Sequence, residues 1–235
     1  MLIPEARWYG QQIKKREAGL FPMLNLGSQT LTFRTQIQPW LDRYLFAPAR
    51  CKGYRVVHSD LQAAEGVDLV GDLTDPAFRE RLIQSQFRSV LCSNLLEHVR
   101  QPEVIAATVA QIVPPGGYLL VSAPFHFPYH PDPIDTMFRP SPQALAALFP
   151  ETDLVEAKLI RGGNLLTYAL QRVIAHPGRI LHELGSKWRT ASNALTNPAE
   201  VDHPPATAAP GRWHWVPWLV RSFAISCVVL RKRQA

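Results

Sequence analysis

The chain has 235 residues, of which 46% are hydrophobic, and it carries a formal net charge of +6. This length favours one sizeable hydrophobic core and is short for two, so we predict a single domain over residues 1–235 with an insertion. The charge would suit an anionic partner, but Lys and Arg are scattered, without a basic stripe of interleaved aromatic residues. The pattern therefore does not favour nucleic-acid binding.

The three cysteines, Cys51, Cys92 and Cys227, are far apart and form no CxxC pair. This spacing supports neither a disulfide framework nor a zinc site, and it fits a reducing, cytoplasmic location best. The most apolar segment, residues 216–230, is interrupted by Arg221 and falls short of the roughly 20 apolar residues that span a bilayer. It is more typical of a buried strand.

Short apolar runs alternate with helical patterns along the chain, which is typical of an α/β fold with a mostly parallel sheet covered on both faces. In chain order, strands are predicted at residues 21–26, 54–58, 67–70, 88–92, 118–123, 154–160 and 223–230. Between them, helical spacing predicts helices at about 37–45 and 102–113.

Two further helices are predicted from their starts, at Asp75-Pro76 and Ser141-Pro142. A side-chain oxygen there caps free amides, and proline suits the first helical turn. An insertion at residues 162–215 separates the last two strands. Its first part, after Asn164, has a helical pattern, whereas residues 193–210 are rich in Pro, Ala and Thr and are typical of a loop.

Small or polar residues follow several predicted strands, at the edge where an open α/β sheet binds its ligands. Asp60 follows the second strand, where its two oxygens could accept both hydroxyls of a ribose. Asp72 follows the third strand and could meet the exocyclic amine of an adenine, with Leu73 packed on the ring. Each aspartate has a structural alternative as a turn residue or a helix cap.

Gly27 ends the first strand and allows the backbone to approach a ligand closely, but the segment lacks the GxGxxG pattern of a dinucleotide site. Asp60 lies 33 residues after Gly27, against roughly 20 for the acidic residue of that fingerprint. A nicotinamide-dependent oxidoreductase is therefore an alternative that the pattern disfavours.

Five features, taken in order, resemble the class I S-adenosylmethionine-dependent methyltransferases that carry an LEH motif. They are LNLGSQ at 24–29, Asp60, VDLVGDLTDP at 67–76, SVLCSNLLEHV at 89–99 and PPGGYLLVSAPF at 114–125. The resemblance covers roughly residues 20–160. It implies a Rossmann-like three-layer sandwich, with a mostly parallel seven-stranded sheet whose last strand is antiparallel.

The same resemblance implies S-adenosylmethionine as the cofactor. It implies that Gly27 lies near the methionine end, Asp60 on the ribose, Asp72 near the adenine and Asn94 along the pocket. The predicted cofactor-binding residues are Asn25, Gly27, Ser28, Asp60, Leu61, Asp72, Leu73 and Asn94. The first motif of the family usually has an acidic residue and two or three glycines, whereas this chain has Asn25 and only Gly27. A noncatalytic binding module with the same fold is therefore a second alternative.

The fifth strand runs into a segment with four prolines, residues 124–135, which we expect to be a stiff loop over the crevice because proline forbids a helix. Methyl transfer to a hydroxyl or amine needs the acceptor close to the methyl carbon and the removal of a proton. The predicted candidates for that base are His130, His98 and His126.

Asp132, Asp135 and Arg139 are expected either to orient this loop through ion pairs or to bind substrate. His126, His130, Asp132 and Asp135 also have ligand types that suit a divalent metal. A metal-dependent hydrolase would leave Asp60 and Asp72 without a purpose, so no metal site is predicted.

The acceptor is expected to be a small molecule, a glycan or a lipid-linked intermediate, which the insertion could recognise as a lid. Trp213, Trp215 and Trp218 could form an aromatic wall or a patch for peripheral membrane contact. Their alternative is to close a core or a dimer contact, and the oligomeric state is not predicted.

Overall fold

The computed structural model describes residues 1–130, 132, 134–164, 166–167 and 216–234. The chain divides into two units, one of residues 1–162 with 223–235 and one of residues 163–222. Several predictions fall outside the described residues. They concern the loop at 193–210, most of the helix after Asn164, and the residues Trp213 and Trp215.

The first unit is built on a seven-stranded sheet with the order β3-β2-β1-β4-β5-β7-β6. Strands β1 to β5 pair in parallel, whereas β7 runs antiparallel to both β5 and β6. The predicted mostly parallel sheet with an antiparallel last strand is therefore confirmed. The strands are β1 (Met23–Leu26), β2 (Val56–Asp60), β3 (Leu69–Val70), β4 (Ser89–Ser93), β5 (Tyr118–His126), β6 (Thr152–Arg161) and β7 (Ala224–Lys232).

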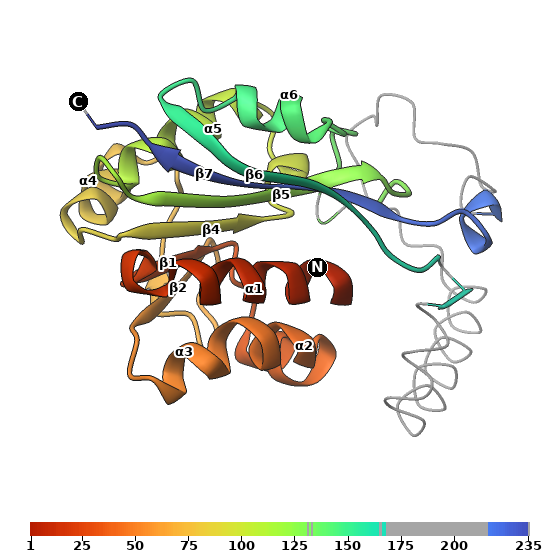
Figure 1. Ribbon diagram of the computed structural model, residues 1–235, viewed down its shortest axis with the longest axis horizontal. Helices are drawn as coiled ribbons and strands as arrows, with labels where there is room; N and C mark the ends of the chain where they lie inside the picture. Colours follow the sequence, from red (N-terminus) through yellow and green to blue (C-terminus); the bar gives the residue numbers. More distant parts are fainter. Residues whose placement is uncertain (131, 133, 165, 168–215, 235) are drawn as a thin grey trace, which may run out of the picture. The chain divides into compact units, whose positions relative to one another are not determined.

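Helices cover the two faces of this sheet and complete the predicted three layers (Figure 1). One face carries α1 (Ile3–Leu20), α2 (Pro39–Leu41) and α3 (Ala47–Cys51), and the other carries α4 (Pro76–Gln84), α5 (Pro102–Ile112) and α6 (Pro142–Ala147). A short 3-10 turn, η3 (Leu96–His98), follows β4, and the second unit contains another, η4 (Val216–Leu219). The main hydrophobic core lies between the sheet and α4 to α6, where Leu24, Val90, Leu119, Phe78 and Val109 are buried together.

The predicted helix starts are confirmed by their capping hydrogen bonds. The Asp75 side chain accepts from the backbone N–H of Ala77 at 3.0 Å, and the Ser141 hydroxyl oxygen accepts from that of Ala144 at 3.1 Å. Each cap satisfies an amide that would otherwise have no partner in the first helical turn.

The helix predicted at 37–45 is instead a series of short turns. Two π-helical turns, η1 (Phe33–Ile37) and η2 (Asp42–Phe46), alternate with α2 and α3. Pro39 begins α2, and Pro48 lies within the first turn of α3. Because proline lacks a backbone N–H, it suits a helix start and interrupts a continuous helix.

Strand β5 is longer than predicted and includes the first residues of the proline-rich segment. It continues through Pro124 to His126, and β4 pairs with it only as far as Ser122. Pro124 therefore lies beyond the last β4 residue, where no β4 carbonyl requires a donor. The expected stiff loop begins only after His126.

Helix α1 was not predicted from the sequence. It buries Ala6, Tyr9 and Ile13 at helical spacing, but its buried face also includes Glu5 and Gln12. These two polar residues interrupt the apolar stripe by which an amphipathic helix is recognised in a sequence.

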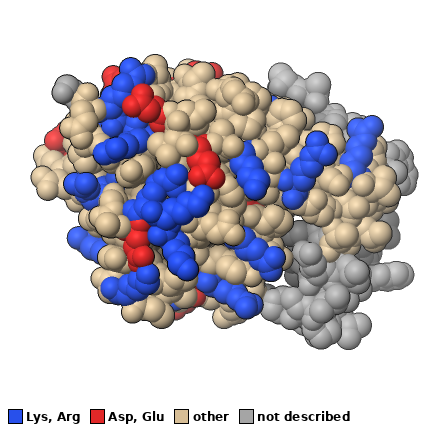
Figure 2. Space-filling view, viewed as in Figure 1, with Lys and Arg blue, Asp and Glu red and all other residues tan. Residues whose placement is uncertain are grey.

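Lys and Arg predominate over Asp and Glu on the face shown in Figure 2. Several Lys and Arg residues of the first unit form ion pairs. The pairs are Lys15 and Arg16 with Glu156, Arg50 with Asp42, and Lys52 with Glu17. Exposed pairs of this kind contribute little to stability.

Two observations concern the expected environment of the protein. Among the described residues, no helix combines the length and hydropathy needed to cross a bilayer. Cys92 and Cys227 are buried, Cys51 is exposed, and all three are free thiols.

Candidate functional site

Gly27 stands between the ends of β2 and β4. Leu26, the last residue of β1, pairs with Ser59 on one side and with Cys92 on the other, so the next residue lies between Asp60 and Ser93. Gly27 has a φ of +62°, and a Cβ there would lie 3.0 Å from Cδ1 of Leu95. Both the backbone conformation and the crowding favour glycine at this turn.

Asp60 connects the first loop to β2. Its Oδ2 accepts the backbone N–H of Gln29 at 2.8 Å, and its Oδ1 accepts that of Gln62 at 3.4 Å. The side chain is half-buried, and a carboxylate offers about four acceptor positions. Asp60 thus lies at the expected sheet edge, anchors the first loop and retains acceptor capacity.

Arg34 holds the same loop through backbone carbonyls, and no role was predicted for it. The side chain is 3% exposed. Its Nη1 donates to the carbonyls of Ser28 and Gln29, and its Nη2 donates to that of Gly66 at 2.7 Å. Burial lowers the pKa of Arg34 below its ordinary value. No motif identifies such an arginine, because its partners are backbone atoms.

Asp72, Leu73 and Leu61 lie around the ends of β2 and β3. Asp72 is exposed, and its Oδ1 accepts the backbone N–H of Thr74 at 2.8 Å, so it forms the turn that was its structural alternative. Leu73 packs partly buried against the main core, whereas Leu61 is 64% exposed. The register pairs Asp60 with Val70, which places all three near the ribose candidate.

Asn25 lies within β1 and is paired across the sheet with His58. Its Nδ2 lies 3.1 Å from the His58 Nδ1, and the imidazole packs edge-on against Phe46. Burial lowers the pKa of His58 to about 4, so the ring is neutral near pH 7 and its Nδ1 accepts the Asn25 amide. Asn25 therefore has a structural partner in β2.

A buried carboxylate from α1 collects the polar groups at the ends of β4 and β5. Glu5 is 0% exposed. Its Oε1 accepts from Ser93 at 3.1 Å, Asn94 at 3.0 Å and Ser122 at 2.6 Å, and its Oε2 accepts the Leu2 amide at 3.0 Å. Asn94 takes a φ of +50°, and within the described residues its buried Oδ1 has no hydrogen-bond partner. No role was predicted for Glu5 from the sequence.

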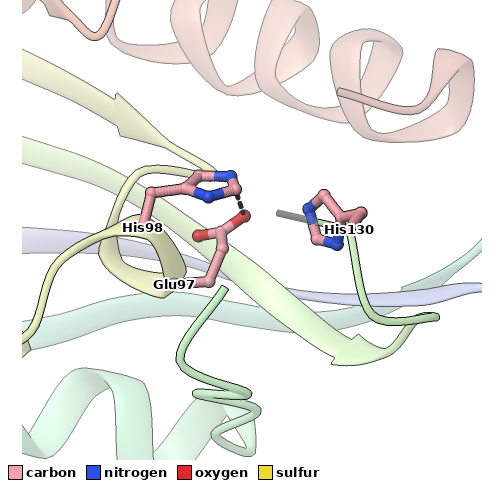
Figure 3. A group of neighbouring side chains, drawn as sticks. All are labelled: Glu97, His98 and His130. Carbon is pink, nitrogen blue, oxygen red and sulfur yellow. Dashed lines mark ion pairs between the residues drawn. The ribbon is translucent and has the colours of Figure 1, made fainter. Parts of the chain in front are cut away.

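Two of the three predicted base candidates meet beside Glu97 (Figure 3). The His98 Nε2 lies 3.8 Å from the Glu97 Oε1, and the His98 and His130 rings are 5.2 Å apart and nearly perpendicular. His126, in contrast, lies exposed at the end of β5 and outside this group.

Glu97 belongs to the LEH motif, but no role was predicted for it. It is 0% exposed, and among the described residues neither carboxyl oxygen has a hydrogen-bond partner. Burial raises the pKa of Glu97 to about 8. The carboxyl group is therefore mostly protonated near pH 7 and exchanges its proton close to neutrality, as a group in acid–base catalysis does.

Asp135 positions the loop that carries His130. Its oxygens accept from Arg139 at 2.6 and 3.0 Å, and Oδ2 also accepts the His130 amide at 3.0 Å. Although burial acts to raise it, the pKa of Asp135 is held below its ordinary value by these hydrogen bonds. Asp135 therefore orients the loop through an ion pair, which is the first of the two roles expected for it.

The neighbouring contacts fix the orientation of both imidazoles. The His98 Nδ1 lies 2.6 Å from the Ile134 carbonyl, and the His130 Nδ1 lies 3.0 Å from that of Pro128. A neutral imidazole that donates through Nδ1 keeps a lone pair on Nε2. Burial lowers the pKa of His130, which favours the neutral form that accepts a proton.

Comparisons with known proteins bear on the fold. No sequence-family model matches the chain, and no curated protein matches it in sequence. A crystal structure of coclaurine N-methyltransferase bound to N-methylheliamine and SAH matches with a TM-score of 0.60 and 15% identity, covering 97% of this chain and 72% of that one. The MccD protein matches with a TM-score of 0.50 and 10% identity, covering 98% and 99%.

The strand order, the antiparallel last strand and the match to a methyltransferase structure agree with one another. This chain has the fold of the class I S-adenosylmethionine-dependent methyltransferases.

Proposed function

We propose that the protein is an S-adenosylmethionine-dependent methyltransferase. One observation carries the proposal: the register of β1, β2 and β4 brings Gly27, Asp60 and Asn94 together at the carboxyl edge of a sheet with methyltransferase topology. This edge is where open α/β sheets bind nucleotide-like ligands.

Features of the edge fit the cofactor. Gly27 leaves room where a side chain would collide with Leu95, which suits close approach by the methionine moiety. Asp60 has acceptor capacity for the ribose hydroxyls, and Asp72 and Leu73 lie one strand further, toward the adenine. The Asn94 Oδ1 lacks a hydrogen-bond partner within the described part of the chain, which fits an N–H donor of the ligand. Asn25, Ser28 and Leu61 complete the proposed set.

The histidines are proposed to remove the proton from the methyl acceptor. Bound S-adenosylmethionine offers an electrophilic methyl group on a sulfonium. In this proposal His98 and His130, with Glu97 between them, accept the proton that an attacking hydroxyl or amine loses. We assign the base to this pair in preference to His126, which is exposed at the end of β5 and does not belong to the group of Glu97, His98 and His130.

The proposed acceptor is a small molecule, a glycan or a lipid-linked intermediate. The coclaurine N-methyltransferase structure holds a small molecule beside SAH, which supports the first of these. A cytoplasmic location and peripheral membrane contact remain predictions from the sequence. Ligand binding separates the proposal from the nicotinamide-dependent alternative, and turnover separates it from the noncatalytic binding module.

Thermal unfolding in the presence of S-adenosylmethionine, S-adenosylhomocysteine or NAD tests the proposal. A ligand at 100 times its dissociation constant stabilises the folded state by about 2.7 kcal/mol, which raises the melting temperature by about 5 to 10 °C for a chain of this length. We expect this shift with the two sulfur ligands and none with NAD. A shift with NAD alone would contradict the proposal, and binding without turnover on any acceptor would favour the binding module.

Asp60→Ala is expected to abolish cofactor binding, because it removes both ribose acceptors. The change also removes the anchor of the Gln29 amide, so Asp60→Asn, which keeps one acceptor oxygen, separates loop anchoring from ligand binding. Asp153→Asn, at a 70% exposed carboxylate on β6, serves as the matched control. Unchanged affinity in Asp60→Ala would remove the ribose assignment.

A further inference from the structure

Glu97, His98 and His130 form a group whose geometry suits a metal ion. Each offers one ligand atom, a carboxylate oxygen or an imidazole nitrogen, and these atoms lie within 4.8 Å of one another. They come from two segments: Glu97 and His98 from the turn after β4, and His130 from the loop after β5. Figure 3 shows the two rings on either side of the carboxylate.

Both imidazoles are held as metal-binding histidines usually are. Protein histidines that bind metal through one nitrogen commonly donate the other N–H to a carbonyl or carboxylate, which fixes the tautomer. The His98 Nδ1 lies 2.6 Å from the Ile134 carbonyl. The His130 Nδ1 lies 3.0 Å from the Pro128 carbonyl and 3.1 Å from the Asp135 Oδ2. The lone pair of each Nε2 is therefore left for a ligand.

Glu97 gives an independent indication that a ligand is needed. The side chain is fully buried, and within the described residues both oxygens lack a hydrogen-bond partner. Burying a carboxyl group without a hydrogen-bond partner is costly in either protonation state, and native proteins rarely leave one so. The nearby Arg139 donates through its two Nη atoms to Asp135 at 2.6 and 3.0 Å, and within the described residues it makes no hydrogen bond to Glu97. A cation between the histidines would satisfy Glu97.

We propose that Glu97, His98 and His130 bind a divalent transition-metal ion, with Zn²⁺ as the best match. Two imidazoles and one carboxylate are a common set for catalytic zinc, and such sites keep a position open for water or substrate. Bonds of about 2.0 to 2.2 Å to zinc require the three side chains to draw together by roughly 1 Å.

The open position also defines an acceptor class, and this step rests on the proposed function. A hydroxyl group bound to the ion loses its proton to water more readily, because the metal charge stabilises the oxyanion. The oxygen lone pair then forms the O–CH₃ bond while the S–CH₃ bond breaks and leaves its electron pair on sulfur. With the ion bound, the two histidines hold the metal in place of acting as the base, and water takes the proton. An alcohol or phenol is then the favoured acceptor.

Direct metal titration of the full chain tests this site. The protein is stripped with EDTA, dialysed and titrated with ZnCl₂ by calorimetry, and with Co²⁺ followed by visible absorption. We expect one ion per chain with micromolar or tighter affinity. Glu97→Gln, His98→Gln and His130→Gln should each weaken binding more than tenfold, since loss of even a supporting residue commonly costs about 10- to 100-fold. His126→Gln, at an exposed histidine outside the group, is the matched control.

The outcomes separate this site from the proposed function. The metal site is overturned if the wild-type chain does not bind zinc, or if the three variants bind zinc with the same affinity as the wild-type chain. Circular dichroism checks that each variant folds, and His130→Gln, at a side chain 33% exposed, carries the test if Glu97→Gln does not fold. Titration with S-adenosylhomocysteine in the presence of EDTA tests cofactor binding independently of the metal. A chain that binds zinc but not S-adenosylhomocysteine supports the metal site and counts against the methyltransferase.

Discussion

At the scale of single residues, Glu5 has the largest set of partners at the carboxyl edge. One buried carboxylate accepts hydrogen bonds from side chains of β4 and β5 and from the start of its own helix. Its removal would leave buried donors without acceptors, which costs more than the loss of the bonds themselves. Glu5 therefore joins the N-terminal helix to the strand that carries Asn94.

Glu5→Ala is expected to lower the free energy of unfolding by about 3 to 5 kcal/mol, because several buried donors lose their common acceptor. Glu5→Gln keeps the volume but places donors against donors, and we expect a loss of about 1 to 3 kcal/mol. Urea unfolding measures both, with Glu103→Gln on the exposed side of α5 as the control. A loss below about 1 kcal/mol in Glu5→Ala would show that the cluster contributes little.

His58 is expected to make stability depend on pH. Its pKa is about 4 in the folded chain and about 6.5 when unfolded. Because the folded value is depressed, the contribution is complete above pH 6.5 and is lost as the pH falls from 6.5 toward 4. The difference in unfolding free energy between the wild type and His58→Gln should therefore shrink as the pH falls through that range, by about 2 kcal/mol. Parallel pH curves for the two proteins would contradict this assignment.

At the scale of elements, short loops hold the site together. Arg34 joins the loop after β1 to Gly66 before β3, and Thr136 donates its backbone N–H to the Glu97 carbonyl at 2.9 Å. Each loop is thereby fixed to another strand end, so the sheet edge is assembled from segments distant in sequence.

Two glycines test how closely elements pack. A Cβ on Gly71 would lie 2.3 Å from the buried ring of Phe78 in α4, whereas one on Gly19 in α1 would lie 3.4 Å from Tyr118. Gly71→Ala should cost about 1 to 3 kcal/mol by overpacking, whereas Gly19→Ala should add about 0.5 to 1 kcal/mol through helix propensity. In a Phe78→Leu background the first cost should shrink. Equal effects of the two substitutions would argue against this close packing.

The sequence predicted elements well where the signal was local. Apolar runs located the strands, and Asp75 and Ser141 marked helix starts that the structure confirms. Helix α1 was missed because Glu5 and Gln12 face inward and break its apolar stripe. One helix was predicted at about 37–45 because the apolar spacing there is helical, although prolines divide the segment at 33–51 into short turns.

At the scale of the whole molecule, the sheet register explains which site residues could be predicted. Gly27, Asp60 and Asn94 end neighbouring parallel strands, and parallel strands bring their carboxyl ends to one edge. Glu5 and Arg34 could not be inferred, because their roles depend on partners elsewhere in the chain. Glu5 meets Ser122 across 117 positions of sequence, and no local pattern encodes such a contact.

A crystal structure with S-adenosylhomocysteine tests the central claim most directly, since it locates the nucleoside relative to the strand ends. We predict that the ribose hydroxyls lie within hydrogen-bonding distance of the Asp60 carboxylate, with the adenine toward Asp72 and the homocysteine moiety beside Gly27. Binding of the ligand away from the ends of β1 and β2, or no binding at millimolar concentration, would contradict the proposed function.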